Sequence, residues 1–166
     1  GQTWLYAGRL SEEKGVDQLL DHWPEGMPLH LYGAGPLEAL VKRRSGKNIH
    51  FRGDYRHREI DRVFSSARGL IFPSATVEAA PAMVYLEALA RGLPVISSAN
   101  NSVADDVELA RSGVVIDSWE DLPRAISHIE ENHHLFSANA LRRHSEEFSE
   151  SNWVSRTLAL YQELLA

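Results

Sequence analysis

The sequence contains no cysteine among its 166 residues. This excludes a disulfide framework and a thiolate metal site, and it is compatible with a reducing cytosol. Positive charge is also scarce, because 17 lysine and arginine residues stand against 23 aspartate and glutamate residues, giving a net charge of −6. Such a balance disfavours a general nucleic-acid surface or anionic-membrane surface. We therefore expect no nucleic-acid partner, and any anionic ligand has to be bound locally.

Long apolar runs are missing as well. No stretch approaches the roughly 20 residues that a membrane span needs, and residues 1–4 lack the charge and the apolar segment of a signal peptide. We expect a cytoplasmic protein without a membrane span. None of the eight histidines forms a helical i, i+4 pair of the kind that indicates zinc, so we expect no metal and interpret the histidines as structural.

The remaining sequence alternates short apolar segments with longer amphipathic ones. Helical spacing is seen, for example, at Val16, Leu19 and Leu20. Strands that are separated by helices cannot pair as hairpins, so they form a mainly parallel sheet with helices on both faces. The pattern predicts a doubly wound, Rossmann-like α/β fold with six strands. The expected strands are 3–8, 28–33, 48–53, 69–74, 93–98 and 113–117.

After residue 117 the pattern becomes wholly helical. We expect additional C-terminal helices near 119–131, 135–147 and 152–165, and the last presents several apolar side chains on one face. The length and the hydrophobic content of 43% suit one domain over residues 1–166. Because the first strand begins almost at residue 1, we expect this domain to come from a longer protein. The apolar side chains of the last helix are Val154, Leu158, Tyr161 and Leu165.

Ligands of an open parallel sheet bind beyond the carboxyl ends of its strands, so the loops there carry the candidate site residues. The loop after the first strand reads GRLSEEKG, in which Gly8 permits a tight turn before Arg9 and Lys14. Arginine offers a planar fork, lysine a point charge and a following helix its free amides, which together would clamp a phosphate. The alternative is two solvated surface cations.

The loop after the second strand reads YGAGPLE. Gly33 and Gly35 free the backbone, and Pro36 suits the first position of a helix. A dinucleotide-binding fingerprint would need a third glycine where Glu38 stands, although Asp54 lies at about the distance of 20 residues that suits a ribose-binding acid. An NAD-binding Rossmann domain is therefore a disfavoured alternative.

The loop after the third strand reads FRGDYRH. Gly53 suits the turn, and Asp54 and Tyr55 follow it at the end of the strand. Taken alone, these residues indicate an ordinary surface turn more than one wall of a binding site.

The loop after the fourth strand carries two glutamates. Pro81 or Ala82 is expected to begin a helix that runs to Arg91, with Glu78 before this helix and Glu87 inside it. Helical side chains lean toward the N-terminus, so the carboxylate of Glu87 can approach the helix start. Both carboxylates are good acceptors for sugar hydroxyls. Alternatively, Glu78 only complements the helix dipole and Glu87 is solvated.

With these motifs the whole chain, residues 1–166, resembles the C-terminal, donor-binding domain of GT-B glycosyltransferases. The resemblance is to the family-four group of retaining enzymes, also called glycosyltransferase group 1. It rests on AGRLSEEKGVDQLL, HLYGAGPLEAL, IHFRGDY and FPSATVEAAPAMVYLEALARGLPVISS, which stand in the family's order. The resemblance implies transfer of a sugar from a nucleoside-diphosphate sugar, such as a UDP- or GDP-sugar, to a glycan, lipid or small-molecule acceptor.

The resemblance also implies partners and residue roles. The acceptor would bind an N-terminal domain that is absent from this chain, the chain alone would transfer little, and the full protein would work at or near the inner face of the membrane, often on surface polysaccharides. No metal or other cofactor is implied. Arg9, Lys14 and Glu78 would act in catalysis, the first two on the diphosphate and the third on the donor sugar. The implied substrate-binding residues are Gly8, Gly33, Gly35, Asp54, Tyr55, Pro81, Ala82, Met83, Val84 and Glu87, of which Glu87 would hold the ribose.

One spacing departs from the family's pattern. Eight residues separate Glu78 from Glu87, whereas the family has one residue fewer, and this puts the strict position at Ala79. A one-residue bulge before the helix would return Glu78 to the sugar; otherwise the sugar contact is changed or lost. A lost contact would favour a different class of protein, namely a non-catalytic module that binds a nucleotide or a sugar phosphate.

Overall fold

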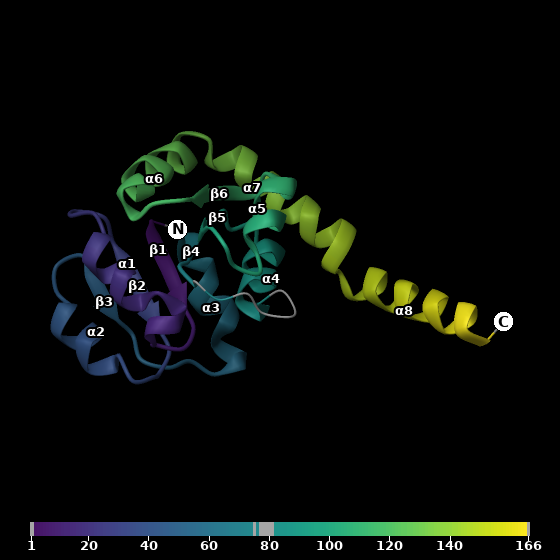
Figure 1. The fold of residues 1–166 in the computed structure, drawn as a ribbon, viewed down its shortest axis with the longest axis horizontal. Helices are drawn as coiled ribbons and strands as arrows, with labels where there is room; N and C mark the ends of the chain where they lie inside the picture. The colour runs from purple at the N-terminus through teal and green to yellow at the C-terminus, as the bar shows by residue number, and fades with distance from the viewer. Residues whose placement is uncertain (1, 75, 77–81, 166) are drawn as a thin grey trace.

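The computed structural model describes residues 2–74, 76 and 82–165. Its centre is a six-stranded parallel sheet in the order β3-β2-β1-β4-β5-β6 (Figure 1). The structure confirms the predicted doubly wound α/β fold, and each expected segment overlaps one strand whose ends differ from the prediction by at most two residues. The strands are β1 Thr3–Ala7, β2 Leu29–Tyr32, β3 Ile49–Phe51, β4 Ala67–Phe72, β5 Val95–Ser98 and β6 Gly113–Ile116.

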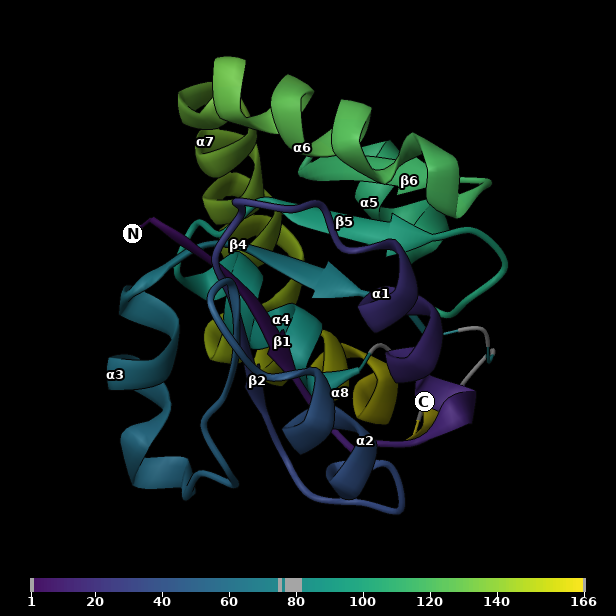
Figure 2. The same cartoon turned by 90° about the vertical axis from the view of Figure 1, so that its left-hand side faces the viewer.

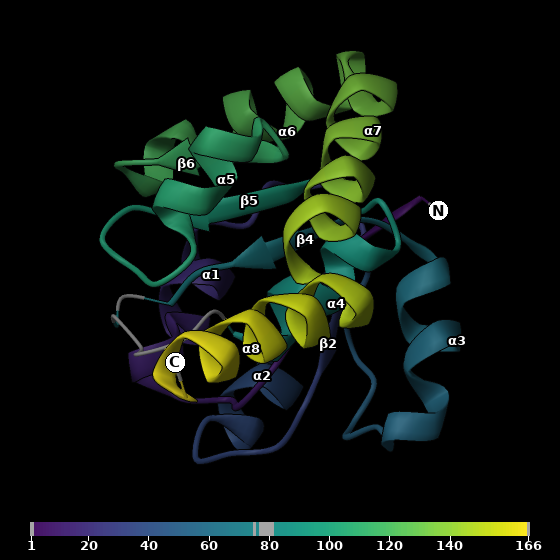
Figure 3. The ribbon, with the colours of Figure 1, turned by 90° about the vertical axis from the view of Figure 1, so that its right-hand side faces the viewer.

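Helices cover both faces of the sheet. Side chains alternate along each strand, so that Trp4 and Tyr6 of β1 enter one core while Leu5 and Ala7 enter the other. Helices α1, α2 and α6 close the first core, as Figure 2 shows, and α3, α4, α5 and α7 contribute to the second, seen in Figure 3. These helices are α1 Val16–His22, α2 Glu38–Arg44, α3 Ile60–Ser65, α4 Met83–Ala90, α5 Ala104–Ala110, α6 Leu122–Glu131 and α7 His133–Arg143.

The order of the strands reverses between β1 and β4. From β1 the chain moves outward through β2 to β3, and it then returns to β4 and moves the opposite way to β6. The loops that follow β1 and β4 therefore leave the same edge of the sheet side by side and diverge. In doubly wound sheets this switch point forms the ligand-binding crevice.

The C-terminal helices follow the prediction with two corrections. The first is preceded by a 3-10 turn over Trp119–Asp121, and the second begins at His133, two residues early, and passes into a π-helical turn over His144–Phe148. Helix α8, Glu150–Leu165, extends away from the sheet in Figure 1. The apolar side chains expected on its one face are all exposed, Leu165 to 87%. Among the described residues, no helix combines the length and apolarity needed to cross a bilayer.

A partly buried polar cluster joins α4 to α5 and α7. The Tyr85 hydroxyl of α4 donates a hydrogen bond of 2.6 Å to the Asp106 carboxylate of α5. Arg143 of α7 donates to the same carboxylate, with Nε 3.0 Å from Oδ1. Burial first, and then Asp106, raise the pKa of Tyr85, so its hydroxyl remains a donor at neutral pH. The cluster holds α4 in place, and α4 carries site residues at its start.

We predict that Asp106→Ala lowers the free energy of unfolding by about 1–3 kcal/mol, because it removes the carboxylate that accepts from the buried Tyr85 hydroxyl and leaves Arg143 with Glu147, 3.7 Å away, as its carboxylate partner. Asp105 is exposed in the same turn of α5, so Asp105→Ala is the matched control, with an expected change within about 0.5 kcal/mol. Urea denaturation measures both. Equal losses in the two variants would show that the cluster does not stabilise the fold.

Candidate functional site

The turns after β1, β2 and β3 are joined by their main chains. The amide of Gly8 donates to the carbonyl of Tyr32 at 3.1 Å, and the amide of Gly33 donates to the carbonyl of Gly53 at 2.9 Å. Gly33 has a φ of 137°, and a Cβ there would lie 1.8 Å from the Gly8 carbonyl oxygen. Only glycine permits this approach, so the turn after β2 is set directly against the turn after β1.

The loop after β1 also lies against the loop after β4. Gly15, with a φ of 68°, ends the first of these loops, and a Cβ there would stand 2.2 Å from the carbonyl oxygen of Pro73. This contact brings the segment that carries Arg9 and Lys14 to the residues that lead toward α4. The loop after β1 and the loop after β4 are therefore in contact at the switch point.

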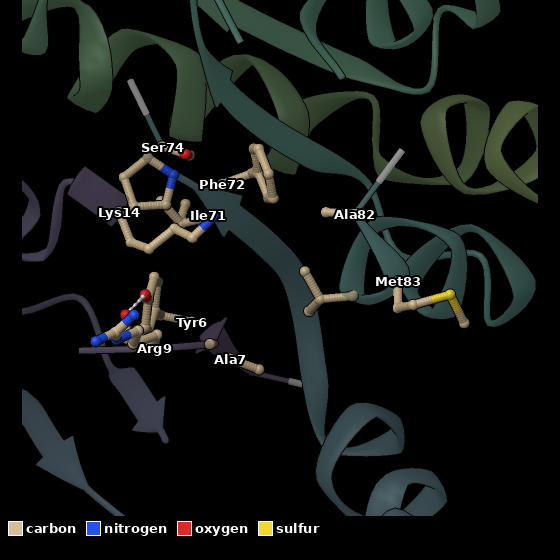
Figure 4. A pocket seen from close by; sticks show the side chains of 12 residues that line it. Tyr6, Ala7, Arg9, Lys14, Ile71, Phe72, Ser74, Ala82 and Met83 are labelled. Atoms are coloured by element: carbon tan, nitrogen blue, oxygen red, sulfur yellow. Dashed lines mark hydrogen bonds between the residues drawn. The ribbon is translucent and has the colours of Figure 1, made fainter. Parts of the chain in front are cut away.

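A cavity of about 130 Å³ opens between these two loops. Arg9 and Lys14 lie on one side of it, and Ala82 and Met83 at the start of α4 lie on the other (Figure 4). We call this the cationic cavity. Its remaining lining residues are Tyr6, Ala7, Gly8, Ile71, Phe72, Pro73, Ser74 and Val84. The structure thus brings Gly8, Arg9, Lys14, Ala82, Met83 and Val84 together, as expected from the sequence.

The helix that lines this cavity starts slightly later than predicted. Helix α4 begins at Met83, and Ala82 is its N-cap residue. Pro81, an alternative predicted start, and Glu78 lie outside the described residues. The amide of Tyr85 in the first turn donates to the Ala82 carbonyl at 2.9 Å. For the amides of Met83 and Val84, helix geometry gives no partner within the helix, and an alanine N-cap has no side-chain acceptor. Together with the helix dipole they favour an anion at this position.

A second, more open cavity of about 470 Å³ adjoins the first. Gly8 and Arg9 line both cavities, so the two are adjacent. We call the second one the carboxylate cavity because Asp54 and Glu87 line it. Its other residues are Gly33, Ala34, Tyr55 and Ile60. Gly35 instead serves the turn, since a Cβ there would lie 2.4 Å from the Leu10 carbonyl oxygen.

Tyr55 is held at the wall of the carboxylate cavity. Its ring packs edge-on against Tyr32, with ring centroids 5.8 Å apart. Burial, followed by the charges of Glu87 and Asp54, raises the pKa of Tyr55 to about 12. The hydroxyl of Tyr55 is therefore neutral at physiological pH. A neutral hydroxyl and two carboxylates form a surface that can bind a ligand rich in hydroxyl groups.

Arg9 is placed by its main chain and is open at its side chain. The hydroxyl of Tyr6 donates a hydrogen bond of 2.6 Å to the Arg9 carbonyl. The guanidinium lies 3.7 Å from a carboxylate oxygen of Glu13, and the Arg9 side chain is 67% exposed. Such exposed ion pairs contribute about 0–1 kcal/mol, so Arg9 can exchange Glu13 for an anionic ligand at little cost.

Tyr6 is a site residue that sequence reasoning missed. It lies within an apolar strand and is buried, so its position resembles that of any core residue. Burial raises its pKa, which keeps its hydroxyl protonated as the donor to Arg9. The sequence offered one signal for it. A tyrosine, which carries a hydroxyl that phenylalanine lacks, stands near the end of the strand that leads to Arg9.

Together the two cavities suit a ligand with an anionic part and a hydroxyl-bearing part. Cations and a helix start surround the first part, and carboxylates with a neutral tyrosine surround the second. Within the part of the chain that the structure describes, no group of three or more His, Cys, Asp or Glu side chains could hold a metal ion.

The sequence is similar to that of known proteins. Residues 1–132 match the profile of the family described as "Glycosyl transferases group 1". The O-antigen chain mannosyltransferase C of Escherichia coli is 28% identical over 173 residues, a match that covers 98% of this chain and 47% of that protein. The alpha-monoglucosyldiacylglycerol synthase of Acholeplasma laidlawii is 24% identical over 139 residues, covering 77% of this chain and 34% of that protein.

Solved structures with the same fold include glycosyltransferases. Sucrose-phosphate synthase from Thermosynechococcus elongatus superposes with a TM-score of 0.82 at 23% identity, covering 99% of this chain and 46% of that one. WaaG, a glycosyltransferase involved in lipopolysaccharide biosynthesis, has a TM-score of 0.71 at 26% identity, covering 89% and 44%. HepE of Anabaena, solved in complex with UDP-glucose, has a TM-score of 0.79 at 19% identity, covering 96% and 49%. The chain spans at most about half the length of these proteins.

We predict that Gly15→Ala costs more stability than Gly26→Ala and also weakens pyrophosphate binding. Both glycines have positive φ, so each substitution costs about 1 kcal/mol of backbone strain. Only at Gly15 does the new methyl group collide with Pro73 and force the two loops apart; at Gly26 no atom lies within 4 Å. Urea denaturation and calorimetry with pyrophosphate measure the two effects. Equal behaviour of the variants would show that the contact between the loops does not shape the cavity.

Proposed function

Since the chain belongs to the glycosyl transferases of group 1, we propose that its two cavities bind a nucleoside-diphosphate sugar, as the donor half of a retaining glycosyltransferase. One observation carries this proposal. Arg9 and Lys14 face the start of α4 across one cavity, and this cavity adjoins another that Glu87 and Tyr55 line. The order of charges along the two cavities matches the order of groups along such a donor.

The parts of the donor then have separate positions. The diphosphate lies in the cationic cavity between Arg9, Lys14 and the first amides of α4. The nucleoside lies in the carboxylate cavity, with its ribose hydroxyls on Glu87 and its base beside the turn at Gly33. A UDP- or GDP-sugar has the required groups. A role of Glu78 at the donor sugar, through a one-residue bulge, belongs to the proposal and rests on the sequence alone.

The cationic cavity would act mainly on the leaving group. When the glycosidic bond breaks, the departing diphosphate gathers negative charge. Groups that are already oriented toward this charge stabilise the transition state more than the ground state. Arg9, Lys14 and the amides at Met83 and Val84 occupy such positions around one cavity. They would supply the positive charge that other transferases draw from a divalent cation.

The acceptor would bind outside these residues. The chain spans 47% of the mannosyltransferase and 34% of the glucosyldiacylglycerol synthase that it matches. We infer that a second, N-terminal domain binds the acceptor and that this chain alone binds donor without efficient transfer. The names of the two relatives mention an O-antigen chain and a diacylglycerol, so a glycan or glycolipid acceptor handled at the inner face of the membrane fits the proposal. The solved complex of HepE with UDP-glucose provides an example of this fold that binds such a donor.

We predict that Arg9→Ala weakens binding of the preferred nucleoside diphosphate by about tenfold to a hundredfold, because it removes a charge-assisted hydrogen bond to the diphosphate. Calorimetry with UDP and GDP measures the affinity. Arg124→Ala is the matched control, since Arg124 is likewise exposed in a one-turn ion pair, with Asp121, on α6. Its affinity should equal that of the unmodified chain.

The same titrations separate the proposal from its alternatives. NAD binding tighter than the binding of both UDP and GDP would contradict the proposal and favour a dinucleotide-binding domain. Unchanged affinity in folded Arg9→Ala would remove the cationic cavity from the donor site. A full-length protein that binds a nucleotide sugar but neither hydrolyses nor transfers it would favour the non-catalytic module.

We also predict that Glu87→Gln reduces the preference for the ribonucleotide over its 2′-deoxy form. The pair to compare is UDP with 2′-deoxy-UDP, or GDP with 2′-deoxy-GDP if the protein binds GDP more tightly. A carboxylate accepts hydrogen bonds from ribose hydroxyls about twice as strongly as a neutral acceptor does. The ratio of the two dissociation constants within one variant cancels any general loss of affinity. A ratio that does not change would place the ribose away from Glu87.

A further inference from the structure

The loop after β5 contains a buried asparagine that touches the loop after β4. Asn101 is 8% exposed. Its Nδ2 atom lies 3.0 Å from the carbonyl oxygen of Ser74 and 2.6 Å from that of Ser98. Ser74 precedes the segment that leads to α4, and it lines the cationic cavity. One side chain thus connects two neighbouring loops at the carboxyl edge of the sheet.

The two ends of the Asn101 side chain have different tasks. Its Oδ1 atom accepts hydrogen bonds from the amides of Val103 at 2.9 Å and Ala104 at 3.2 Å, where α5 begins. Because amide nitrogens donate and carbonyl oxygens accept, this contact fixes the orientation of the group and directs Nδ2 at the carbonyls of Ser74 and Ser98. The oxygen caps α5, and the nitrogen binds the loop after β4.

Ser74 is held from several directions. The Ser98 hydroxyl donates a second hydrogen bond, of 2.8 Å, to the same carbonyl of Ser74. The residue before it, Pro73, is in close contact with Gly15 of the first loop. Ser74 itself is 2% exposed. The loop after β4 is therefore fixed between the first loop and the loop after β5, at the point where it enters the cavity.

We propose that Asn101 is a positioning residue for glycosyl transfer: through its Nδ2 it holds Ser74 in the wall of the cationic cavity, which Arg9 and Lys14 also line. This inference rests on the proposed function of the cationic cavity. Asn101 does not line either cavity, so it acts through Ser74 and touches no donor atom. Geometry at the leaving group governs turnover strongly, and a displacement of about 1 Å can reduce a rate about a hundredfold.

The substitution Asn101→Asp tests this role in the full-length protein. Aspartate keeps the oxygen that caps α5 but replaces the donor nitrogen with an oxygen that repels the carbonyl of Ser74. We expect kcat to fall about tenfold or more, and the affinity for UDP or GDP to fall with it, because their diphosphate lies in the same cavity as Ser74. The affinity for the free nucleoside, uridine or guanosine, should stay within about twofold, because the nucleoside lies in the carboxylate cavity. The control is Asn139→Asp on α7, where an asparagine amide donates to the carbonyl of Arg111 at 2.9 Å, outside both cavities.

A merely structural role would give a different pattern. It would lower the melting temperature and the amount of active protein, with kcat per folded molecule equal to that of the unmodified protein, and this would overturn the proposal. Ser98→Ala supplies a second variant, in case Asn101→Asp does not fold. It removes the other hydrogen bond to the Ser74 carbonyl and a longer one of 3.3 Å from Asn101 Nδ2, but it leaves the bond from Asn101 to Ser74 in place. We expect a smaller loss of kcat there, again with an unchanged affinity for the free nucleoside, and an unchanged kcat would likewise contradict the proposal.

The measurements also separate this inference from the proposed function. If the unmodified full-length protein neither binds a nucleoside diphosphate nor transfers sugar, the donor site itself is refuted, and the role of Asn101 with it. If the unmodified protein is active and Asn101→Asp retains its kcat, only the role of Asn101 is refuted.

Discussion

The close approach of two main chains, at Gly15 and Pro73, determines the geometry of the whole candidate site. Strands β1 and β4 are neighbours, so their loops emerge about 5 Å apart, but adjacency alone does not decide which atoms face each other. Contact at Gly15 turns Arg9 and Lys14 toward the start of α4. A similar contact between Gly33 and Gly8 sets the turn that borders the carboxylate cavity. Backbone packing thus fixes the frame, and side chains add charge to it.

The charge in this frame is local. The protein carries a net charge of −6, yet its cationic cavity combines two basic side chains with a helix start. At physiological ionic strength, charges separated by more than about 8 Å of solvent are largely screened, so distant carboxylates barely affect an anion in the cavity. Glu13 is the acidic neighbour of Arg9, and their exposed pair is weak. A negatively charged protein can therefore bind a diphosphate without a basic surface.

The sequence was sufficient for the fold and for part of the site. Parallel strands are buried on both faces, which makes them continuous apolar runs, and this is why all six were found while their ends were off by one or two residues. Arg9, Lys14 and Glu87 were predictable because their loops or helix follow strands β1 and β4. Tyr6 and Asn101 were not, since one resembles a core residue and the other an ordinary loop residue.

The role of Asn101 depends on a partner 27 positions away, and no local pattern reports such a contact. The last helix also shows that a local pattern does not report tertiary contacts. Its periodicity predicted the helix α8, but it did not predict that the apolar side chains of α8 would be exposed in this chain.

The openness of the two cavities to solvent bears on the proposed reaction. Both cavities are open to solvent at the rim, where about two thirds of the surface of Arg9 and of Met83 is exposed. A developing charge is stabilised most effectively where water is excluded, because fixed dipoles act more strongly in a dry site. Water at this rim would compete with the acceptor for the sugar and screen the cations at the leaving group. The same openness that would let a nucleotide sugar enter therefore means that efficient transfer would need another surface, that of the proposed acceptor-binding domain, to close over the rim.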